Sequence, residues 1–170
     1  MTATNGKAWT FGDHVNSESI MPSKGAVGEV GSATDHVLEF YDPEFPKKVQ
    51  PGDFIVAGRN FGASSGRPSG EVIKAKGVRA IICNSAGRVF YRNTWNMGLA
   101  VLQCPGIRSK VEKGDDLEVD IEAGTIKLLK TGETLQAEET PWILLDIYHE
   151  GGMVGWIKSR RKEYKTLEQN

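Results

Sequence analysis

The stretch that decides the fold runs from residue 53 to residue 104 and opens with DFIVAGRNFGASSGRPSGEVIKAKGVRAIIC at residues 53–83. Residues 54–57, FIVA, form a short apolar run, which is typical of a strand buried on both faces of a parallel sheet. A loop with four glycines and three serines follows at residues 58–70. Residues 68–76 predict a helix, because Pro68 suits a first helical turn and Gly77 suits a helix end.

Helix and strand continue to alternate along the same stretch. Residues 78–83, VRAIIC, and residues 99–104, LAVLQC, predict two further buried strands, and residues 86–97 predict the helix between them. Short joints of this kind imply right-handed crossovers between parallel strands. The sequence therefore predicts an α/β fold with a parallel βαβαβ part, in which ligands bind at the carboxyl ends of the strands.

The glycine-rich loop has the composition of an anion site. Loop amides at a helix start point outward with partial positive charge, and Arg67 can clamp a carboxylate with two parallel hydrogen bonds. Ser65 adds a hydroxyl beside it, and the turn at residues 84–85 falls at the same end of the predicted sheet. A carboxylate or phosphate site is one interpretation, and a tight surface loop with a purely structural role is the other.

Two segments before this stretch are rich in small or polar residues. Residues 12–22, GDHVNSESIMP, are interpreted as a turn, a helix cap or the edge of a site. Residues 23–34 carry Gly, Ser and Ala without periodicity, so a lid that selects the substrate and a disordered connector both fit. A short strand is expected within residues 9–15, and a short helix or irregular segment at residues 35–45.

The last third of the chain changes character. Residues 117–128 alternate in polarity around a turn at residues 122–124, which predicts a β-hairpin, and residues 131–132 make a second turn. A further apolar run lies at residues 141–148, and a helix with a basic face is expected from about Gly152. A solvated helix face explains those basic residues better than a binding patch does.

Length and composition favour one domain over residues 1–170, with residues 1–8 disordered and residues 158–170 a charged C-terminal helix or tail. The formal net charge of −1 gives no electrostatic case for a nucleic-acid or membrane partner. No apolar run is long enough to span a membrane. The two cysteines, Cys83 and Cys104, form no CxxC pair, so no metal site is expected within the chain, and a cytoplasmic location is the simplest expectation.

The run DPEFPKKVQPGDFIVAGRNFGASSGRPSGEVIKAKGVRAIICNSAGRVFYRNTWNMGL resembles the small subunits of 3-isopropylmalate dehydratase (isopropylmalate isomerase) and, more widely, the swivelling domain of the aconitase family. That family usually reads NFGCGSSREHA in the loop. GDHVNSESIMP resembles its GDDIDTDxIIP, and NTWNMGL resembles its NCxxNGL. The likeness covers most of residues 9–107 and implies a swivelling β/β/α domain of the aconitase type, with a β-rich C-terminal part ending in a helix.

The resemblance implies a function. Members of the family remove water from a hydroxy di- or tricarboxylic acid and add it back, which makes this chain the small subunit of a heteromeric hydro-lyase that is active only with a large subunit. The large subunit is expected to carry a [4Fe-4S] cluster, with no cofactor in this chain. Besides the large subunit and the small hydroxy acid, a homo-oligomer of the isolated chain is compatible with these features.

Residue roles follow from aligning the loop without a gap. The family's serine base falls on Ser65 and its substrate-binding arginine on Arg67. The other implied substrate-binding residues, four of them glycine or polar residues of the two motifs and one acidic, are Ser64, Gly66, Asn60, Ser17 and Glu18.

The sequence departs from the family pattern inside the loop. Pro68 and Ser69 stand where the family has Glu-His, Ala63 replaces its cysteine, and residues 23–34 lack its usual Tyr-Leu-Arg-like segment. Two outcomes fit these departures: a divergent hydro-lyase subunit acting on another hydroxy acid, or a lost or altered activity. The alternative function from a different class is a stand-alone carboxylate-binding module on the same fold.

Overall fold

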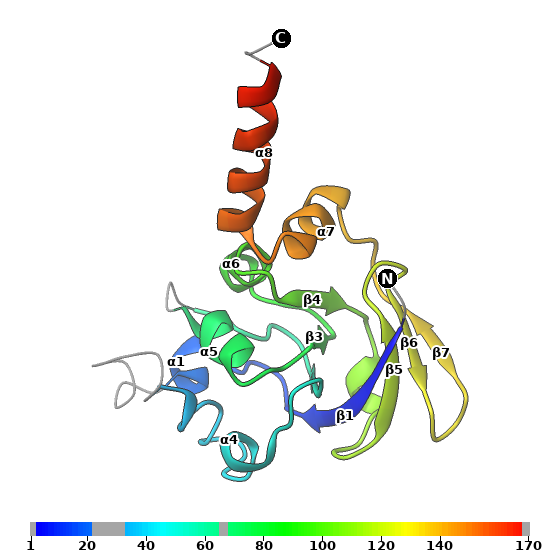
Figure 1. Cartoon of the computed structure of the whole chain (residues 1–170). Coiled ribbons are helices and arrows are strands. Elements are labelled where there is room, and N and C mark those ends of the chain that lie inside the picture. The colour runs from blue at the N-terminus through cyan, green and yellow to red at the C-terminus, as the bar shows by residue number, and fades with distance from the viewer. Residues whose placement is uncertain (1–2, 22–32, 65–67, 168–170) are drawn as a thin grey trace.

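The computed structural model describes residues 3–21, 33–64 and 68–167 (Figure 1). Within these ranges the strands form one seven-stranded sheet in the order β4-β3-β2-β1-β5-β6-β7. The strands are β1 (Thr4–Thr10), β2 (Phe54–Ala57), β3 (Ala80–Cys83), β4 (Ala100–Gln103), β5 (Asp116–Asp120), β6 (Thr125–Leu128) and β7 (Thr134–Gln136). The predicted α/β class is confirmed.

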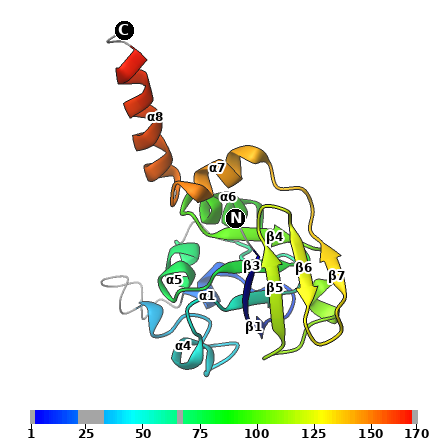
Figure 2. The same ribbon diagram turned by 45° about the vertical axis from the view of Figure 1, so that its right-hand side comes forward.

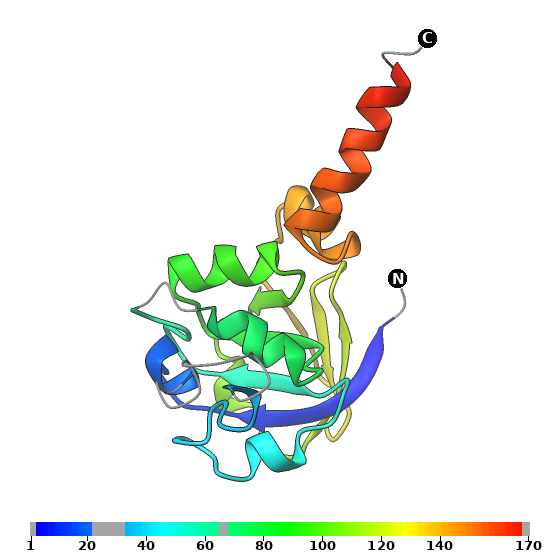
Figure 3. The same ribbon diagram turned by 60° about the vertical axis from the view of Figure 1, so that its left-hand side comes forward.

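Helices lie mainly beside the parallel part of the sheet. In chain order they are α1 (Ser17–Ile20), α4 (Phe45–Lys48), α5 (Ser69–Ala75), α6 (Arg88–Asn96), the 3-10 helix η1 (Ile107–Ser109), α7 (Trp142–His149) and α8 (Met153–Leu167). Figure 3 shows α5 and α6, both green, side by side on one face of the sheet. They are the crossover helices that connect β2 to β3 and β3 to β4.

The parallel half, β1 to β4, is the predicted βαβαβ part with one more strand beside it. β2 pairs parallel with β3, and β3 with β4, in registers that place Ala57 beside Cys83 and Cys83 beside Gln103. All residues of β2 and β3 are buried, as expected of parallel strands covered on both faces. The prediction for β2 is confirmed to the residue, and those for β3 and β4 to within two residues.

Strand β1 joins the two halves of the sheet. Its second half pairs parallel with β2, with Trp9 beside Ile55, and its first half pairs antiparallel with β5, with Asn5 beside Glu118. The expectation that residues 1–8 are disordered is wrong for this segment, because β1 begins at Thr4. Exposed residues at its start alternate with half-buried ones, and their ladder partners lie more than a hundred residues further along the chain.

The antiparallel half, β5 to β7, contains the predicted hairpin. β5 and β6 pair antiparallel, with Val119 beside Ile126, and β5 alternates between exposed or half-buried and buried residues. β7, which the sequence analysis did not anticipate, follows the turn at residues 131–132. Beyond β7, the Glu138 N–H donates to the Gln103 carbonyl at 2.7 Å, so the sheet curls until its two ends meet.

The C-terminus consists of two helices where one was expected. The apolar run at residues 142–148 forms α7, and α8 begins at Met153, one residue from the predicted start. Trp156 Nε1 and Arg160 Nη2 donate to Asp146 Oδ2 at 2.7 and 2.6 Å, which ties α8 to α7. These two donors, Trp156 foremost, lower the pKa of Asp146. Figures 1 and 2 show α8 extending away from the body of the molecule.

Candidate functional site

The candidate site lies at the carboxyl ends of β1, β2 and β3, where the three following loops keep pairing with one another. The Gly62 N–H donates to the Val15 carbonyl at 2.7 Å, and the Ser17 N–H donates to the Ala63 carbonyl at 3.0 Å. Asn16 and Ala63 form an isolated parallel bridge. The loop after β2 is therefore held along one side by the segment after β1.

The loop after β3 holds the other side of the loop after β2. The Phe61 N–H donates to the Ser85 carbonyl at 3.0 Å, and the Gly87 N–H donates to the Phe61 carbonyl at 2.8 Å. Ser85 Oγ also accepts from the Asn60 N–H at 2.9 Å. Residues 61–63 therefore lie between two hydrogen-bonded segments, in the same order as the strands β1, β2 and β3 that these segments follow.

Unusual backbone conformations mark the start and end of this segment. Asn60 has φ +58°, Gly62 has φ +74° and Ser64 has φ +72°, in a region that side chains other than Asn and Asp rarely adopt. At Gly62 a side chain is excluded for a second reason, because a Cβ would lie 2.1 Å from Phe90 Cγ. The backbone conformation of the loop therefore explains two residues of the sequence NFGAS, Asn60 and Gly62.

An ion pair fixes the base of the loop. Asp13 Oδ1 accepts from the Arg59 N–H at 2.7 Å, and Asp13 Oδ2 accepts from Arg59 Nε and Nη2 at 2.9 and 2.8 Å. The backbone N–H of Arg59, followed by its guanidinium, lowers the pKa of Asp13. Gly58 is required at this point, since a Cβ there would lie 2.1 Å from Asp13 Oδ1.

The structure separates the residues that the resemblance assigns to substrate binding. Asn60 and Ser64 are exposed at the loop surface, whereas Ser17 is fully buried beneath it. Glu18 is exposed in α1, a helix capped by Asn16, whose Oδ1 accepts from the Ser19 N–H at 2.8 Å. Ser65, Gly66 and Arg67 lie outside the described residues, as do residues 23–32 of the expected lid or connector. Helix α5 begins at Ser69, one residue after the predicted start at Pro68, which is its N-cap.

An open pocket of about 540 Å³ lies against this loop. Loop residues and the first turn of α6 line it: Asn60, Gly62, Ala63, Ser64, Gly87, Arg88 and Val89. The sequence analysis missed the α6 side of the pocket. The signal was available, because the helix predicted at residues 86–97 had to start at the same edge of the sheet. Arg88, an exposed cation in that first turn, adds positive charge where an anionic ligand would lie.

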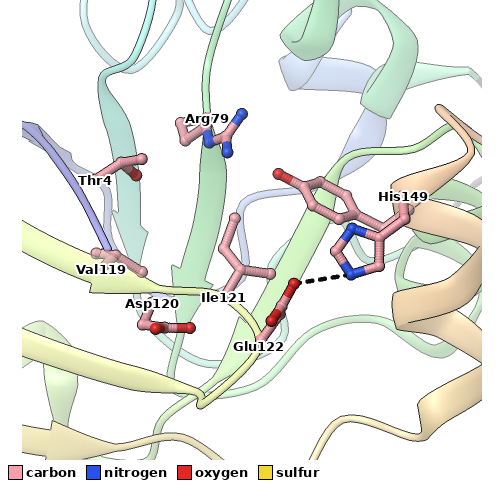
Figure 4. A pocket seen from close by; sticks show the side chains of 8 residues that line it. Thr4, Arg79, Val119, Asp120, Ile121, Glu122 and His149 are labelled. Carbon is pink, nitrogen blue, oxygen red and sulfur yellow. Dashed lines mark ion pairs between the residues drawn. The ribbon is translucent and has the colours of Figure 1, made fainter. Parts of the chain in front are cut away.

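A second, much smaller cavity lies at the other end of the strands, where Arg79 precedes β3 (Figure 4). Its volume is about 10 Å³, which leaves room for about one water molecule. In the wall of this cavity, His149 Nε2 lies 3.0 Å from Glu122 Oε1, and this contact joins α7 to the turn between β5 and β6. This cavity belongs to the packing between α7 and the sheet, away from the candidate site.

Metal ligands do not gather in the part of the chain that the structure describes: no group there contains three or more His, Cys, Asp or Glu side chains. Burial raises the pKa of Cys83 to about 12 and also raises the pKa of Cys104. Among the described helices, none has the length and apolarity to cross a membrane.

Comparison with known proteins gives the class of this domain. Residues 13–106 match the model of the family described as Aconitase C-terminal domain. The matched range contains residues 13–22 of the GDHVNSESIMP motif, the glycine-rich loop and all of β2, β3 and β4. The chain belongs to this family.

Relatives similar along nearly the whole chain are small subunits. The chain is 40% identical over 160 residues to the isopropylmalate/citramalate isomerase small subunit of Methanocaldococcus jannaschii, covering 93% of this chain and 95% of the relative. It is 42% identical over 159 residues to 3-isopropylmalate dehydratase small subunit 1 of Archaeoglobus fulgidus, covering 92% and 98%. The crystal structure of 3-isopropylmalate dehydratase from M. jannaschii superposes with a TM-score of 0.91 at 32% identity, covering 97% of this chain and 99% of that one. The predicted family and fold are confirmed.

Proposed function

We propose that this chain is the small subunit of a heteromeric hydro-lyase, which dehydrates and rehydrates a hydroxy di- or tricarboxylic acid together with a large subunit. The observation that carries the proposal is the loop at residues 60–64, which neighbouring loops hold on both sides at the carboxyl edge of the parallel strands. The names of the similar small subunits support the same reaction class.

In this proposal Ser65 is the base and Arg67 holds a substrate carboxylate. An ordinary serine hydroxyl is a weak base, so its deprotonated form needs amides and positive charge around it. In this proposal the cation Arg88 at the pocket rim contributes positive charge to such an environment. The planar guanidinium of Arg67 suits a carboxylate better than a lysine would, because it forms two parallel hydrogen bonds.

The large subunit completes the site in this proposal. Its expected [4Fe-4S] cluster supplies Lewis-acid chemistry to the departing hydroxyl when bound. The described residues of this chain offer no ligand set for that group. The chain's own contributions are the serine base, the carboxylate clamp, and the loops that hold both while the large subunit covers the pocket.

The test is co-expression with a candidate large subunit, anaerobic reconstitution with iron and sulfide, and assay of the complex on hydroxy diacids that include 3-isopropylmalate and citramalate. Activity should require both chains and fall by about 10²- to 10⁴-fold in Ser65→Ala, the usual contribution of a positioned base. Ser109→Ala is the control, because it removes a serine hydroxyl outside the glycine-rich loop, one that donates to the Gly106 carbonyl at 2.8 Å in η1.

The stand-alone carboxylate-binding module is the second candidate, and the exposed Arg88 at the pocket rim favours it. Under that function the isolated chain binds hydroxy acids without a partner, and Ser65→Ala leaves the affinity unchanged. Calorimetric titration of the isolated chain with the same panel of acids distinguishes the two functions. Turnover that depends on both chains and on Ser65 rules the module out.

A further inference from the structure

Ser17 is a polar residue sealed inside the candidate site. Its side chain is fully buried, and its Oγ lies 3.0 Å from the Gly62 carbonyl and 3.0 Å from the Ala63 carbonyl. One hydroxyl proton serves these two acceptors. The Ser17 N–H adds a third bond, to the Ala63 carbonyl, so Ser17 bonds both peptide groups at the centre of the loop.

The burial of Ser17 separates it from a ligand in the pocket. Gly62 and Ala63 line that pocket, whereas Ser17 does not. The hydroxyl therefore lies behind the loop, on the side facing the core. A group in this place can act on a substrate only through the loop, since its donor is directed at backbone carbonyls.

The position of Ser17 is itself fixed by the core. Val15 on one side and Ile20 on the other are fully buried, and the Ile20 carbonyl accepts from the Leu38 N–H at 3.0 Å. The segment after β1 therefore cannot shift without disturbing the core. Through its hydrogen bonds, Ser17 holds the Gly62 and Ala63 carbonyls against this fixed segment. Ser65 follows Ala63 by two residues in the sequence.

We propose that Ser17 is a positioning residue, which holds the Gly62 and Ala63 carbonyls and so fixes the segment from which the chain continues to Ser65. This role differs from the substrate contact that the family resemblance implies, and it rests on the proposed hydro-lyase function. Because the base acts in the transition state while Arg67 binds the ground state as well, a displaced loop should lower kcat more than it raises KM.

The first experiment uses the reconstituted complex. Ser17→Ala should lower kcat by about 10- to 100-fold, the usual effect of displacing a catalytic group by about 1 Å, with KM changed by less than about 3-fold. Ser17→Thr keeps the donor, and threonine is the residue of the family motif, so this variant should restore kcat. Ser109→Ala serves as the control. A raised KM at unchanged kcat would mark Ser17 as a substrate contact and overturn the proposal.

The second experiment does not depend on activity, so it separates this inference from the proposed function. Hydrogen–deuterium exchange of the isolated chain should be about 10-fold faster at the Phe61 and Gly62 amides in Ser17→Ala, with the β5 and β6 amides unchanged as a check on folding. Unchanged exchange at these two amides overturns the proposal. If exchange at these two amides is faster but the chain forms no active complex, the result supports the positioning role and rules out only the proposed reaction.

Discussion

The two halves of the sheet use their sequence differently. In β2 and β3 every residue is buried, and the loops that follow them are held by backbone hydrogen bonds. In β5 and β6 burial alternates with exposure or half-burial, and the turn between β6 and β7 carries Gly132, at which a Cβ would meet nothing within 4 Å. In the parallel half, which carries the site, burial requires apolar side chains at consecutive residues of β2 and β3. In the antiparallel half, burial requires them only at every second residue of β5 and β6.

The largest expected effect tests this comparison in the strands themselves. Ile81→Ala and Ile82→Ala, at neighbouring buried positions of β3, should each lower the free energy of unfolding by about 2–5 kcal/mol. In β6, Ile126→Ala should cost a similar amount, whereas Lys127→Ala at the next, exposed position should change it by less than about 0.5 kcal/mol. Urea unfolding measures all four. A cost below about 1 kcal/mol at either β3 position would contradict the two-sided burial.

The next effect compares two glycines with nearly equal φ. Gly62 has φ +74° and Gly132 has φ +76°, but a Cβ meets Phe90 at Gly62 and nothing within 4 Å at Gly132. Gly132→Ala should therefore cost only the left-handed backbone strain, about 1–2 kcal/mol. Gly62→Ala adds the clash with a buried ring and should cost clearly more, in thermal or urea unfolding. The double variant Gly62→Ala/Phe90→Ala serves as the control, because removing the ring should cancel part of the additional cost. Equal losses in the two glycine variants would show that Phe90 moves aside freely.

The parallel half could be predicted from sequence because its signals are local. Short apolar runs at residues 54–57, 78–83 and 99–104 marked β2, β3 and β4, and the predicted hairpin followed from alternation alone. The strand expected within residues 9–15 was placed too late, since β1 spans Thr4–Thr10: its first residues are polar and its antiparallel partner β5 lies far along the chain. α7 was read only as an apolar run, since WILLDIY has no polar face to reveal a helical period.

The candidate site was predicted only in part, because only some of its features depend on local sequence. The loop after β2 is a local motif, and its neighbour at residues 84–85 follows from parallel topology. The burial of Ser17 depends on how the segment after β1 packs under that loop, which spacing along the chain does not encode. Arg88 and Val89 join the pocket only because α6 begins beside the loop, so their place depends on packing in three dimensions.

A smaller effect compares two exposed ion pairs, one in each half. Arg59 lowers the pKa of Asp13, so the stability from this pair is present above the ordinary Asp pKa and is lost as pH falls through the lowered one. Asp13→Asn should be less stable than the wild type at neutral pH and equal to it at pH values below the lowered pKa. Urea midpoints across this range measure the difference. Glu112→Gln, which breaks a single exposed contact with Lys130 at 3.2 Å, should change little at any pH. A difference between Asp13→Asn and the wild type that does not vary with pH would mean that the carboxylate charge contributes nothing there.

The smallest expected effect concerns the two thiols at the carboxyl edge of the parallel half. Cys83 ends β3 and Cys104 follows β4, both buried, and Cys104 Sγ lies 3.7 Å from the Gln136 carbonyl of β7. Because burial raises the pKa of Cys83 to about 12, almost none of it is thiolate near pH 8, and an aromatic disulfide reagent should not react with the native chain. In guanidinium both thiols should react at once. Reaction of Cys83 in the native state, at a rate above that of global unfolding, would show that the strand ends beneath the site open locally. The continuous burial of the parallel half would then hold for its strands but not for this edge.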